Sequence, residues 1–314
     1  MKTILVTGAA GFIGTNLILK LLDDKNNKII AIDNFMTGSI KNIPNHNNLT
    51  FYNFDICKTD VIDFILHNYE KIDEIYHLAS IASPIHYKKH PLETLNVGYN
   101  GTKNILEIVY YYKSRFLFTS TSEIYGDPKE HPQKESYHGN VNCYGQRSCY
   151  DESKRVAESL VYSYRTLYNL DTKIVRIFNT YGPYMNIDDG RIITEIIKAI
   201  KLEQPLKIND YGIQTRSFSF VNDTIEMMIN VMNSEYNHPI NIGNDNEISI
   251  NELIKIAEEV TNKKIEVVYN KHNDIDDPKV RKPCLSLYKM LISKDIHKTN
   301  LRDGFKETFE FFQK

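Results

Sequence analysis

Cysteine is scarce in this chain of 314 residues. The four cysteines, Cys57, Cys143, Cys149 and Cys284, form no C-x-x-C pair and have no histidine-rich cluster near them. This usage is typical of reduced thiols in a cytoplasmic protein. It excludes a disulfide framework and a cysteine-based metal site, so no bound metal is expected.

Excess charge and long apolar runs are lacking as well. The formal net charge is -2 at pH 7, which gives no electrostatic reason to expect nucleic acid or an anionic membrane as a partner. No apolar run approaches the roughly 20 residues that span a bilayer, and the run after Met1 stops at Thr7, too early for a secretory signal. With 41% apolar and 25% charged residues, we expect one large or two moderate globular domains.

A strand, a glycine turn and a helix are predicted in that order at the N-terminus. The β-branched run 3–7 is followed by Gly8, Gly11 and Gly14, spaced as G-x-x-G-x-x-G, and then by a helical pattern. Such a turn presents backbone N–H groups to a pyrophosphate. Asp33 ends the second strand, where a carboxylate binds ribose hydroxyls and repels a 2′-phosphate, favouring NAD over NADP. A tight turn that merely packs a helix is the alternative.

Strands and helices then alternate, which predicts an α/β fold with a doubly wound parallel sheet. Further strands are expected at 28–32, 49–55, 74–78, 115–120 and 172–178, and helices at 61–69, 91–113 and 150–167. From about Met185 the pattern changes to short strands and helices, which indicates a smaller mixed α/β lobe. We expect an NAD-binding Rossmann domain over 1–184 and a mainly substrate-binding lobe over 185–314, with strands from 215–245 free to return to the sheet.

Tyr150 and Lys154 are the strongest candidates for chemistry. They are four residues apart at the start of a predicted helix, so they project from the same face. A neighbouring cation favours the phenolate, so Lys154 is expected to bring Tyr150 toward work as a base at neutral pH. Thr121 or Ser122, at the preceding strand end, could hold the substrate hydroxyl meanwhile.

The same spacing arises by chance elsewhere in a chain with 21 tyrosines. It occurs at Tyr99 and Lys103 and at Tyr125 and Lys129. The first pair has a glycine between its members and the second a proline, which bars a regular helical turn. The Tyr150 pair leads instead into a long helical pattern.

Longer motifs carry a resemblance that covers essentially the whole chain. The glycine spacing is similar to that of extended short-chain dehydrogenases/reductases. Segments 125–152 and 176–191, with shorter matches at 214–218, 276–278 and 281–283, resemble the UDP-glucuronate decarboxylases, also called UDP-xylose synthases. Four positions in or beside the long loop 127–148 depart from the usual family pattern, and they bear on rate and loop ordering more than on the reaction: His138, Cys143, Tyr144 and Ser153.

The resemblance implies NAD as cofactor, UDP-glucuronate as substrate and a set of site residues. Catalytic roles are implied for Thr121, Ser122, Glu123, Tyr150, Lys154 and Arg281. Cofactor contacts are implied for Gly8, Gly11, Phe12, Ile13, Gly14, Asp33, Asn34, Phe35, Thr37, Gly38, Asp55, Ile56, Leu78, Ala79, Ser80, Asn96, Thr119, Tyr150 and Lys154. Substrate contacts are implied for Tyr87, Glu123, Asn179, Tyr181, Arg191, Arg216 and Arg281. Without the motifs, each arginine would read as a solvated surface charge.

The implied reaction begins when Tyr150 takes the proton from the sugar O4 and NAD takes hydride from C4. The 4-keto acid then loses carbon dioxide, and returned hydride gives UDP-xylose. The alternatives are release of the UDP-4-keto-pentose with NADH, a nucleotide-sugar 4-epimerase, a 4,6-dehydratase, and a non-enzymatic NAD-binding protein. The dehydratases require an Asp-Glu pair where Ser122 and Glu123 stand, and a non-enzyme typically loses the tyrosine or the lysine.

The resemblance also implies a homodimer. Helices 91–113 and 150–168 carry tyrosines at positions expected to be exposed, namely Tyr110, Tyr111, Tyr162 and Tyr164. In related enzymes these two helices pair with their copies in a second chain as a four-helix bundle. The alternative is that the tyrosines cap the edges of the core.

Overall fold

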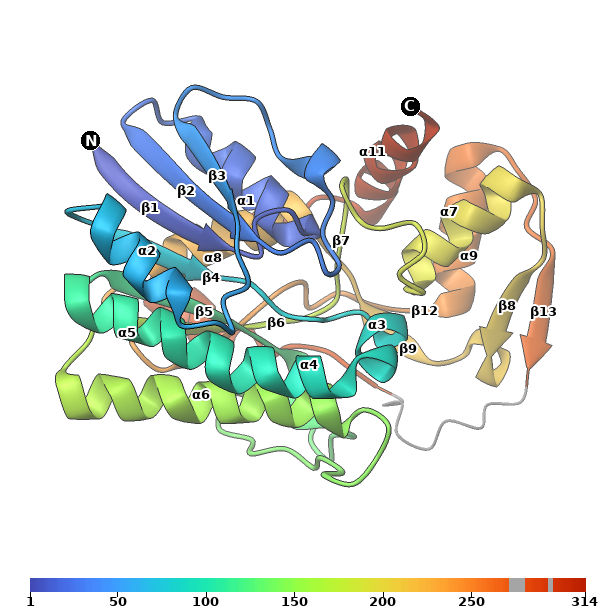
Figure 1. Ribbon diagram of the computed structural model, residues 1–314. Coiled ribbons are helices and arrows are strands. Elements are labelled where there is room, and N and C mark those ends of the chain that lie inside the picture. The colour runs from blue at the N-terminus through green and yellow to red at the C-terminus, as the bar shows by residue number, and fades with distance from the viewer. Residues whose placement is uncertain (271–279, 293–295) are drawn as a thin grey trace.

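The computed structural model describes residues 1–270, 280–292 and 296–314, so the 276–278 match lies outside the described residues. Within them, seven parallel strands form a central sheet in the order β11-β6-β5-β4-β1-β2-β3 (Figure 1). The strands are β1 (Lys2–Thr7), β2 (Asn27–Asp33), β3 (Leu49–Asn53), β4 (Glu74–His77), β5 (Arg115–Thr121), β6 (Thr172–Ile177) and β11 (Pro239–Ile242). The order reverses between β1 and β4, where such sheets bind ligands. This arrangement confirms the predicted doubly wound α/β fold.

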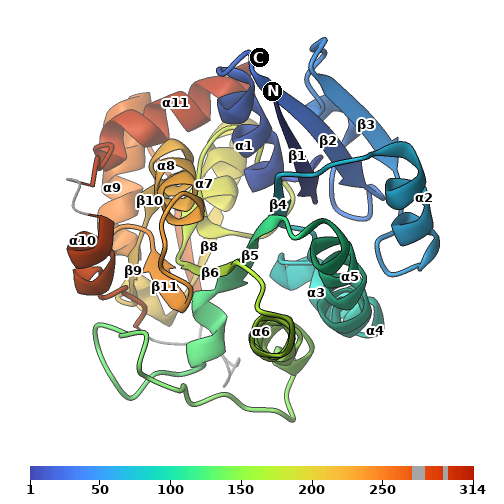
Figure 2. The same ribbon diagram turned by 90° about the vertical axis from the view of Figure 1, so that its left-hand side faces the viewer.

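Helices cover both faces of the sheet, as Figure 2 shows from the sheet end. The faces are covered by α1 (Phe12–Leu22) and α8 (Val221–Met232) on one side, and by α2 (Asp60–Asn68), α5 (Thr102–Tyr112) and α6 (Ser148–Tyr168) on the other. Because strand side chains alternate between faces, Ile4 and Val6 pack into the first core and Leu5 into the second. Among the described helices, none is long and apolar enough to cross a bilayer.

The helix predicted over 91–113 is divided into three parts. α4 (Pro91–Asn96) and α5 are joined by a π-helical turn at Val97–Gly101. In this turn Gly98 lies against α6, where a Cβ atom on Gly98 would come within 2.6 Å of the Ser153 Cβ. The prediction of one regular helix was therefore wrong, because close packing against α6 reshapes its middle. Helix α3 (Pro84–Lys89), just before it, was not predicted at all.

A smaller group of elements lies beyond the carboxyl ends of the sheet strands. Its helices are α7 (Ile192–Leu202), α9 (Ile250–Thr261), α10 (Ser286–Ile292) and α11 (Leu301–Gln313). Its strands pair as β8 (Leu206–Asn209) with β13 (Val267–Asn270), β9 (Thr215–Ser217) with β12 (Glu247–Ser249), and β10 (Ser219–Phe220) with β7 (Thr180–Tyr181). Between these elements the chain goes back to the central sheet, because β11 pairs in parallel with β6.

Candidate active site

A pocket of about 1240 Å³ lies where the sheet strands end and the smaller group of elements faces them. Its wall includes the turn after β1, the ends of β4, β5 and β6, and side chains from α6 and β9. This volume exceeds that of a typical single-ligand site, so it can hold two large ligands together. All the residues implied above to contact cofactor or substrate line it, except Phe35.

Phe35 is absent from the pocket wall, and Asn96 lines it with an exposed side chain. Phe35 has a backbone φ of 59° and its ring packs on Phe51, with centroids 5.2 Å apart, so it lies outside the pocket wall. The side chain of Asn96 is exposed and its Oδ1 accepts a hydrogen bond from Asn100 Nδ2 at 2.7 Å. Asn96 lines the pocket, and the position buried against α6 is Gly98.

The turn after β1 has the features of a pyrophosphate site. Gly8 has a φ of +69°, and a side chain there would collide with the backbone of Ala79 on the neighbouring strand end. Gly11 caps α1 without a side-chain hydrogen bond in the described structure, so the first N–H groups of the helix face the pocket. These features fit a dinucleotide whose phosphates lie on the helix N-terminus.

Asp33 is fixed beside this turn by two backbone donors. Its Oδ2 accepts a hydrogen bond from Ala10 N at 3.0 Å and its Oδ1 accepts one from Phe35 N at 2.7 Å. Burial raises the pKa of Asp33, although these backbone hydrogen bonds oppose the rise. The carboxylate is thus held in one orientation at the pocket wall, where a ribose diol fits and a 2′-phosphate meets negative charge.

Tyr150 is buried at the start of α6, beside the end of β5. Its ring stacks on the ring of Tyr87 from α3, with centroids 5.2 Å apart and planes within 4° of parallel. Burial raises the pKa of Tyr150 to about 12, and the charge of Glu123 adds to the rise, whereas a hydrogen bond with Thr121 and the charge of Arg191 oppose it. The expected lowering of the pKa by Lys154 is therefore wrong for the protein by itself, because burial outweighs the favourable contacts.

Lys154 instead binds the neighbouring strand. Its Nζ donates a hydrogen bond to Thr119 O at 2.8 Å and lies 4.9 Å from the centre of the Phe118 ring. Burial lowers the pKa of Lys154 to about 7, against the opposing charge of Glu158. Burial thus weakens the hold of this amine on its proton, and a bound ligand that supplies acceptors would favour the charged form.

Glu123 lies between two buried arginines. Arg281 binds it with both guanidinium nitrogens, one of them 2.8 Å from Oε2, and Arg147 binds the same Oε2. Burial acts to raise the pKa of Glu123, but the charges of Arg281 and Arg147 outweigh it and lower the pKa to about 2. Glu123 is thus ionised at neutral pH, and two guanidinium groups face this one carboxylate.

Asp151 is a second acid near this group. It is 5% exposed, and its Oδ1 has no hydrogen-bond partner among the described residues. Burial, together with the charge of Glu123, raises the pKa of Asp151 to about 7, although Arg147 and Arg281 act against the rise. Asp151 therefore holds its proton to a higher pH than an exposed aspartic acid does.

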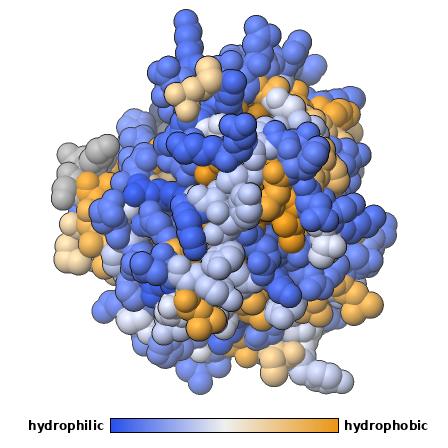
Figure 3. All heavy atoms as spheres, turned by 60° about the vertical axis from the view of Figure 1, so that its left-hand side comes forward, coloured by the Kyte–Doolittle hydropathy of each residue, from blue (hydrophilic) through white to orange (hydrophobic). Residues whose placement is uncertain are grey.

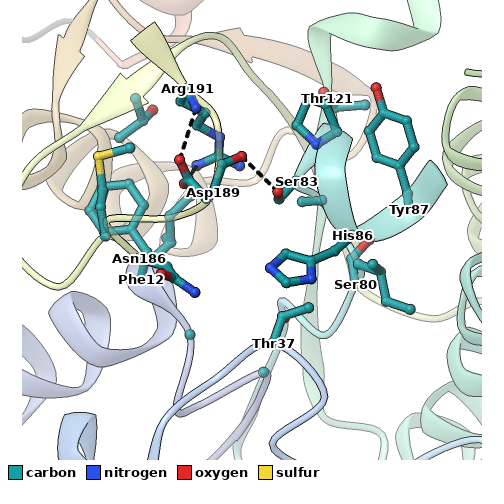
Figure 4. A pocket seen from close by; sticks show the side chains of 18 of the residues that line it. Phe12, Thr37, Ser80, Ser83, His86, Tyr87, Thr121, Asn186, Asp189 and Arg191 are labelled. Carbon is teal, nitrogen blue, oxygen red and sulfur yellow. Dashed lines mark hydrogen bonds and ion pairs between the residues drawn. The ribbon is translucent and has the colours of Figure 1, made fainter. Parts of the chain in front are cut away.

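The opposite wall comes from the segment before α7. Figure 4 shows Asp189 between Ser83 and Arg191: Ser83 Oγ donates to Asp189 O at 2.8 Å, and the Arg191 guanidinium lies 3.6 Å from Asp189 Oδ2. Because Arg191 acts on the pKa of Tyr150, it lies close enough to influence the reacting end of the pocket. Thr121 and Tyr87 lie across from it in the same view.

Tyr181 and Asn179 follow β6. Tyr181 lines the pocket, but its ring packs on Phe220 at 5.7 Å and its hydroxyl points at Gly304 of α11. Its hydroxyl is buried without a partner among the described residues, so it faces the core more than a ligand. Asn179 is half-buried at the strand end and remains a predicted substrate contact.

Several lining residues had no role in the predictions. Arg147 stands three residues before Tyr150 within segment 125–152, and the need to neutralise a buried Glu123 is the signal that could have identified it. Ser83 and Asp189 meet across the pocket, and Phe311 and Phe312 reach its wall from α11. These contacts join segments far apart in the sequence, so no local pattern could have revealed them.

Comparison with known proteins gives a consistent family. A model described as the NAD dependent epimerase/dehydratase family matches residues 4–243. UDP-glucuronic acid decarboxylase 3 of Arabidopsis thaliana is 42% identical over 99% of this chain and 89% of its own length. UDP-glucuronic acid decarboxylase 4 of the same plant is also 42% identical over 96% of this chain, which spans only 66% of that relative.

Solved structures of similar proteins cover nearly the whole chain. The UDP-glucose 4-epimerase of Thermotoga maritima, solved with UDP-glucose, has a TM-score of 0.90 and 25% identity over 99% of this chain and 98% of its own. The UDP-glucuronic acid 4-epimerase of Bacillus cereus, solved with UDP-glucuronic acid and NAD, has a TM-score of 0.87 and 27% identity over 99% of both chains.

Proposed function

The chain belongs to the NAD dependent epimerase/dehydratase family, and we propose that within it the protein converts UDP-glucuronate to UDP-xylose and carbon dioxide. The full-length similarity to UDP-glucuronic acid decarboxylases supports this choice over the structurally similar epimerases. The proposal places Tyr150, Lys154, Thr121, Ser122, Glu123 and Arg281 in the catalytic group, and adds Arg147 to it.

The observation that carries the proposal is the pair of buried guanidinium groups at Glu123. Arg147 and Arg281 both bind this carboxylate, and both line the pocket wall together with Tyr150. A sugar carboxylate bound beside Tyr150 would therefore meet guanidinium groups that are already held in place. Guanidinium groups bind carboxylates bidentately and keep their charge when buried, so they suit a uronic acid better than a neutral sugar.

The first step removes hydrogen from the sugar. Tyr150, held by Thr121, takes the proton from the O4 hydroxyl as the C4–H bond breaks and C4 becomes a ketone. NAD, when bound, would accept that hydride and later return it to C4. Since burial keeps the pKa of Tyr150 at about 12 in the protein alone, the base works only when Lys154 and the ligands in the pocket stabilise the phenolate.

The second step breaks the bond between C5 and the carboxylate. The electron pair moves toward the C4 carbonyl, carbon dioxide leaves, and C5 then takes a proton. Arg147 and Arg281 hold the carboxylate before it leaves, and Glu123 fixes both guanidinium groups so that little reorganisation is needed. After C4 is reduced again, Tyr150 returns the proton to O4 and the product is UDP-xylose.

Incubation with UDP-glucuronate and NAD, followed by mass spectrometry, tests this function. We expect loss of one carbon dioxide per substrate without net accumulation of NADH. Accumulating NADH with a keto-pentose product would indicate early release of the intermediate, and an unchanged substrate mass with altered chromatographic mobility would indicate a 4-epimerase. Either result would contradict the proposal.

We also propose a homodimer that works in the cytoplasm. α4, α5 and α6 lie side by side in both ribbon views, and their outer surfaces expose Leu92, Tyr111, Tyr162 and Leu167. On the face in Figure 3, apolar side chains form separate patches in a mostly hydrophilic surface. All four cysteines are unpaired, which supports a reducing compartment. Light scattering at micromolar protein should give the dimer mass, and a monomer mass would contradict this assembly.

A further inference from the structure

The guanidinium of Arg281 depends on the placement of a short irregular segment. Residues 280–285 precede α10 and belong to no helix or long strand. A long arginine side chain reaches Glu123 from this segment, so a shift of its backbone would move the guanidinium away from the carboxylate. Binding groups need placement within about 0.5 Å for full effect. Something outside the segment must therefore fix it.

Gln133, in the long loop after β5, supplies that attachment through both its backbone and its side chain. Gln133 N donates to Lys282 O at 2.9 Å, and Cys284 N donates to Gln133 O at 2.8 Å. The side-chain Oε1 accepts a further hydrogen bond from Lys282 N at 2.9 Å. The residue next to Arg281 is thus held at both its N–H and its carbonyl group.

Gln133 is itself held firmly. It is completely buried, and its Nε2 donates to Glu130 O at 2.7 Å. Its carbonyl also accepts a hydrogen bond from Asn241 Nδ2 at 3.1 Å. Asn241 lies on β11 of the central sheet and its Oδ1 accepts from the Tyr125 hydroxyl at 2.8 Å. The loop is therefore attached to the central sheet.

We propose that Gln133 is a positioning residue for Arg281, which it holds against Glu123 ready for the carboxylate of the substrate. The inference rests on the proposed function, because it assigns the uronate to Arg281. The side chain of Gln133 touches the segment next to Arg281 and acts only through it. Its loss should therefore weaken recognition of the carboxylate and spare the rest of the nucleotide sugar.

The test compares UDP-glucuronate with UDP-glucose, which has no carboxylate. Dissociation constants are measured by calorimetry on NAD-loaded protein in a Tyr150→Phe background, so that no substrate is consumed. Gln133→Leu keeps the backbone hydrogen bonds and removes those of the side chain, to Lys282 N, Glu130 O and the His131 ring. We expect it to reduce the preference for UDP-glucuronate about 10-fold or more, with little change for UDP-glucose. The matched control is Gln146→Leu, in an exposed part of the same loop, which should leave both constants unchanged.

A double-mutant cycle separates positioning from a general structural role. In an Arg281→Gln background, Gln133→Leu should cause almost no further loss of preference, because its effect passes through Arg281. A full loss that persists there, or an equal loss for both ligands, would overturn the inference. If Gln133→Leu does not fold, Gln133→Asn, which draws the amide back from Lys282 N, is measured instead.

The two proposals fail in different ways. A wild-type protein that releases no carbon dioxide from UDP-glucuronate contradicts the proposed function, whatever the binding constants show. A wild-type protein that decarboxylates, together with a Gln133→Leu variant that keeps the full preference for the uronate, contradicts the positioning role alone.

Discussion

Ser83 Oγ donates a hydrogen bond to the backbone carbonyl of Asp189 at 2.8 Å, and both residues are buried. This bond joins the start of α3 to the segment before α7 across the pocket (Figure 4). Replacing Ser83 by alanine should lower the free energy of unfolding by about 1 kcal/mol, because one buried hydrogen bond is lost. Bound NADH should dissociate about fivefold faster if the loss of this bond makes opening of the pocket easier by the same free energy.

Stopped-flow fluorescence of NADH release and chemical denaturation measure the two effects. The control is Ser163→Ala, which removes a serine-to-carbonyl hydrogen bond within α6, away from the pocket. A Ser83→Ala variant that releases NADH at the wild-type rate would show that this contact does not hold the pocket closed.

Tyr150→Phe should reduce decarboxylation by about 10²- to 10⁴-fold, because the variant keeps the ring and its stacking on Tyr87 but cannot accept the O4 proton. Product formation is followed by mass spectrometry, and NAD binding is checked by calorimetry. Tyr99→Phe is a matched control, since Tyr99 also stands four residues before a lysine but lies exposed in the π-helical turn. Wild-type turnover by the Tyr150 variant would refute its role as the base.

Arg147→Met should weaken UDP-glucuronate binding and also destabilise the fold. Removing one partner of a buried carboxylate costs about 3 kcal/mol of folding free energy, because the charge of Glu123 is then less well compensated in the variant. Arg302→Met breaks an exposed pair with Glu259, for which we expect a change below about 1 kcal/mol. Urea denaturation measures the free energy of unfolding of both variants. Equal losses would mean that Glu123 does not depend on Arg147 for its charge compensation.

Asp33→Ser should shift the cofactor preference toward NADP. The carboxylate, fixed by Ala10 N and Phe35 N, repels a 2′-phosphate, and removing that charge should raise the ratio of NADP to NAD affinity at least about tenfold. Titration with both cofactors measures the ratio. Asp63→Ser, on the exposed side of α2, controls for loss of charge alone. An unchanged ratio would place the adenosine ribose elsewhere.

Asp151→Asn should stabilise the protein more at pH 8 than at pH 4. Burial raises the pKa of Asp151 from 3.8 to about 7, so between these values the folded state binds the proton more tightly than the unfolded state. The free energy of unfolding contributed by this group therefore falls as pH rises through that window and stays lower above it. Asparagine does not ionise, so the gain over wild type should grow with pH. A gain equal at both values, measured by thermal unfolding, would contradict the raised pKa.

The sheet and the dinucleotide-binding turn after β1 were predictable because short sequence patterns determine them. Short runs rich in apolar residues, separated by segments of helical periodicity, coincide with strands of the central sheet. A glycine is needed at position 8 because a side chain there would collide with the backbone of Ala79. The spacing of Tyr150 and Lys154 also brought both side chains to the pocket. Each of these features depends on residues that are close together in the sequence.

The parts that escaped prediction depend on contacts between distant segments. The π-helical turn exists where Gly98 meets Ser153, and the pKa of Tyr150 rises because the fold buries it. Arg147 matters because it binds Glu123, and Gln133 matters because it binds Lys282 in the segment before α10. A sequence pattern does not state which segments become neighbours, so neither burial nor these pairings could be read from it.

Strand β11 enters the central sheet only after the chain has built much of the opposite wall of the pocket. A cut after residue 184 would leave the edge of β6 without its neighbour and invite association with other chains. The halves therefore should not be obtainable as separate stable fragments. During synthesis the sheet stays one strand short until residue 242 has left the ribosome, so the segments before and after residue 184 complete their folding together.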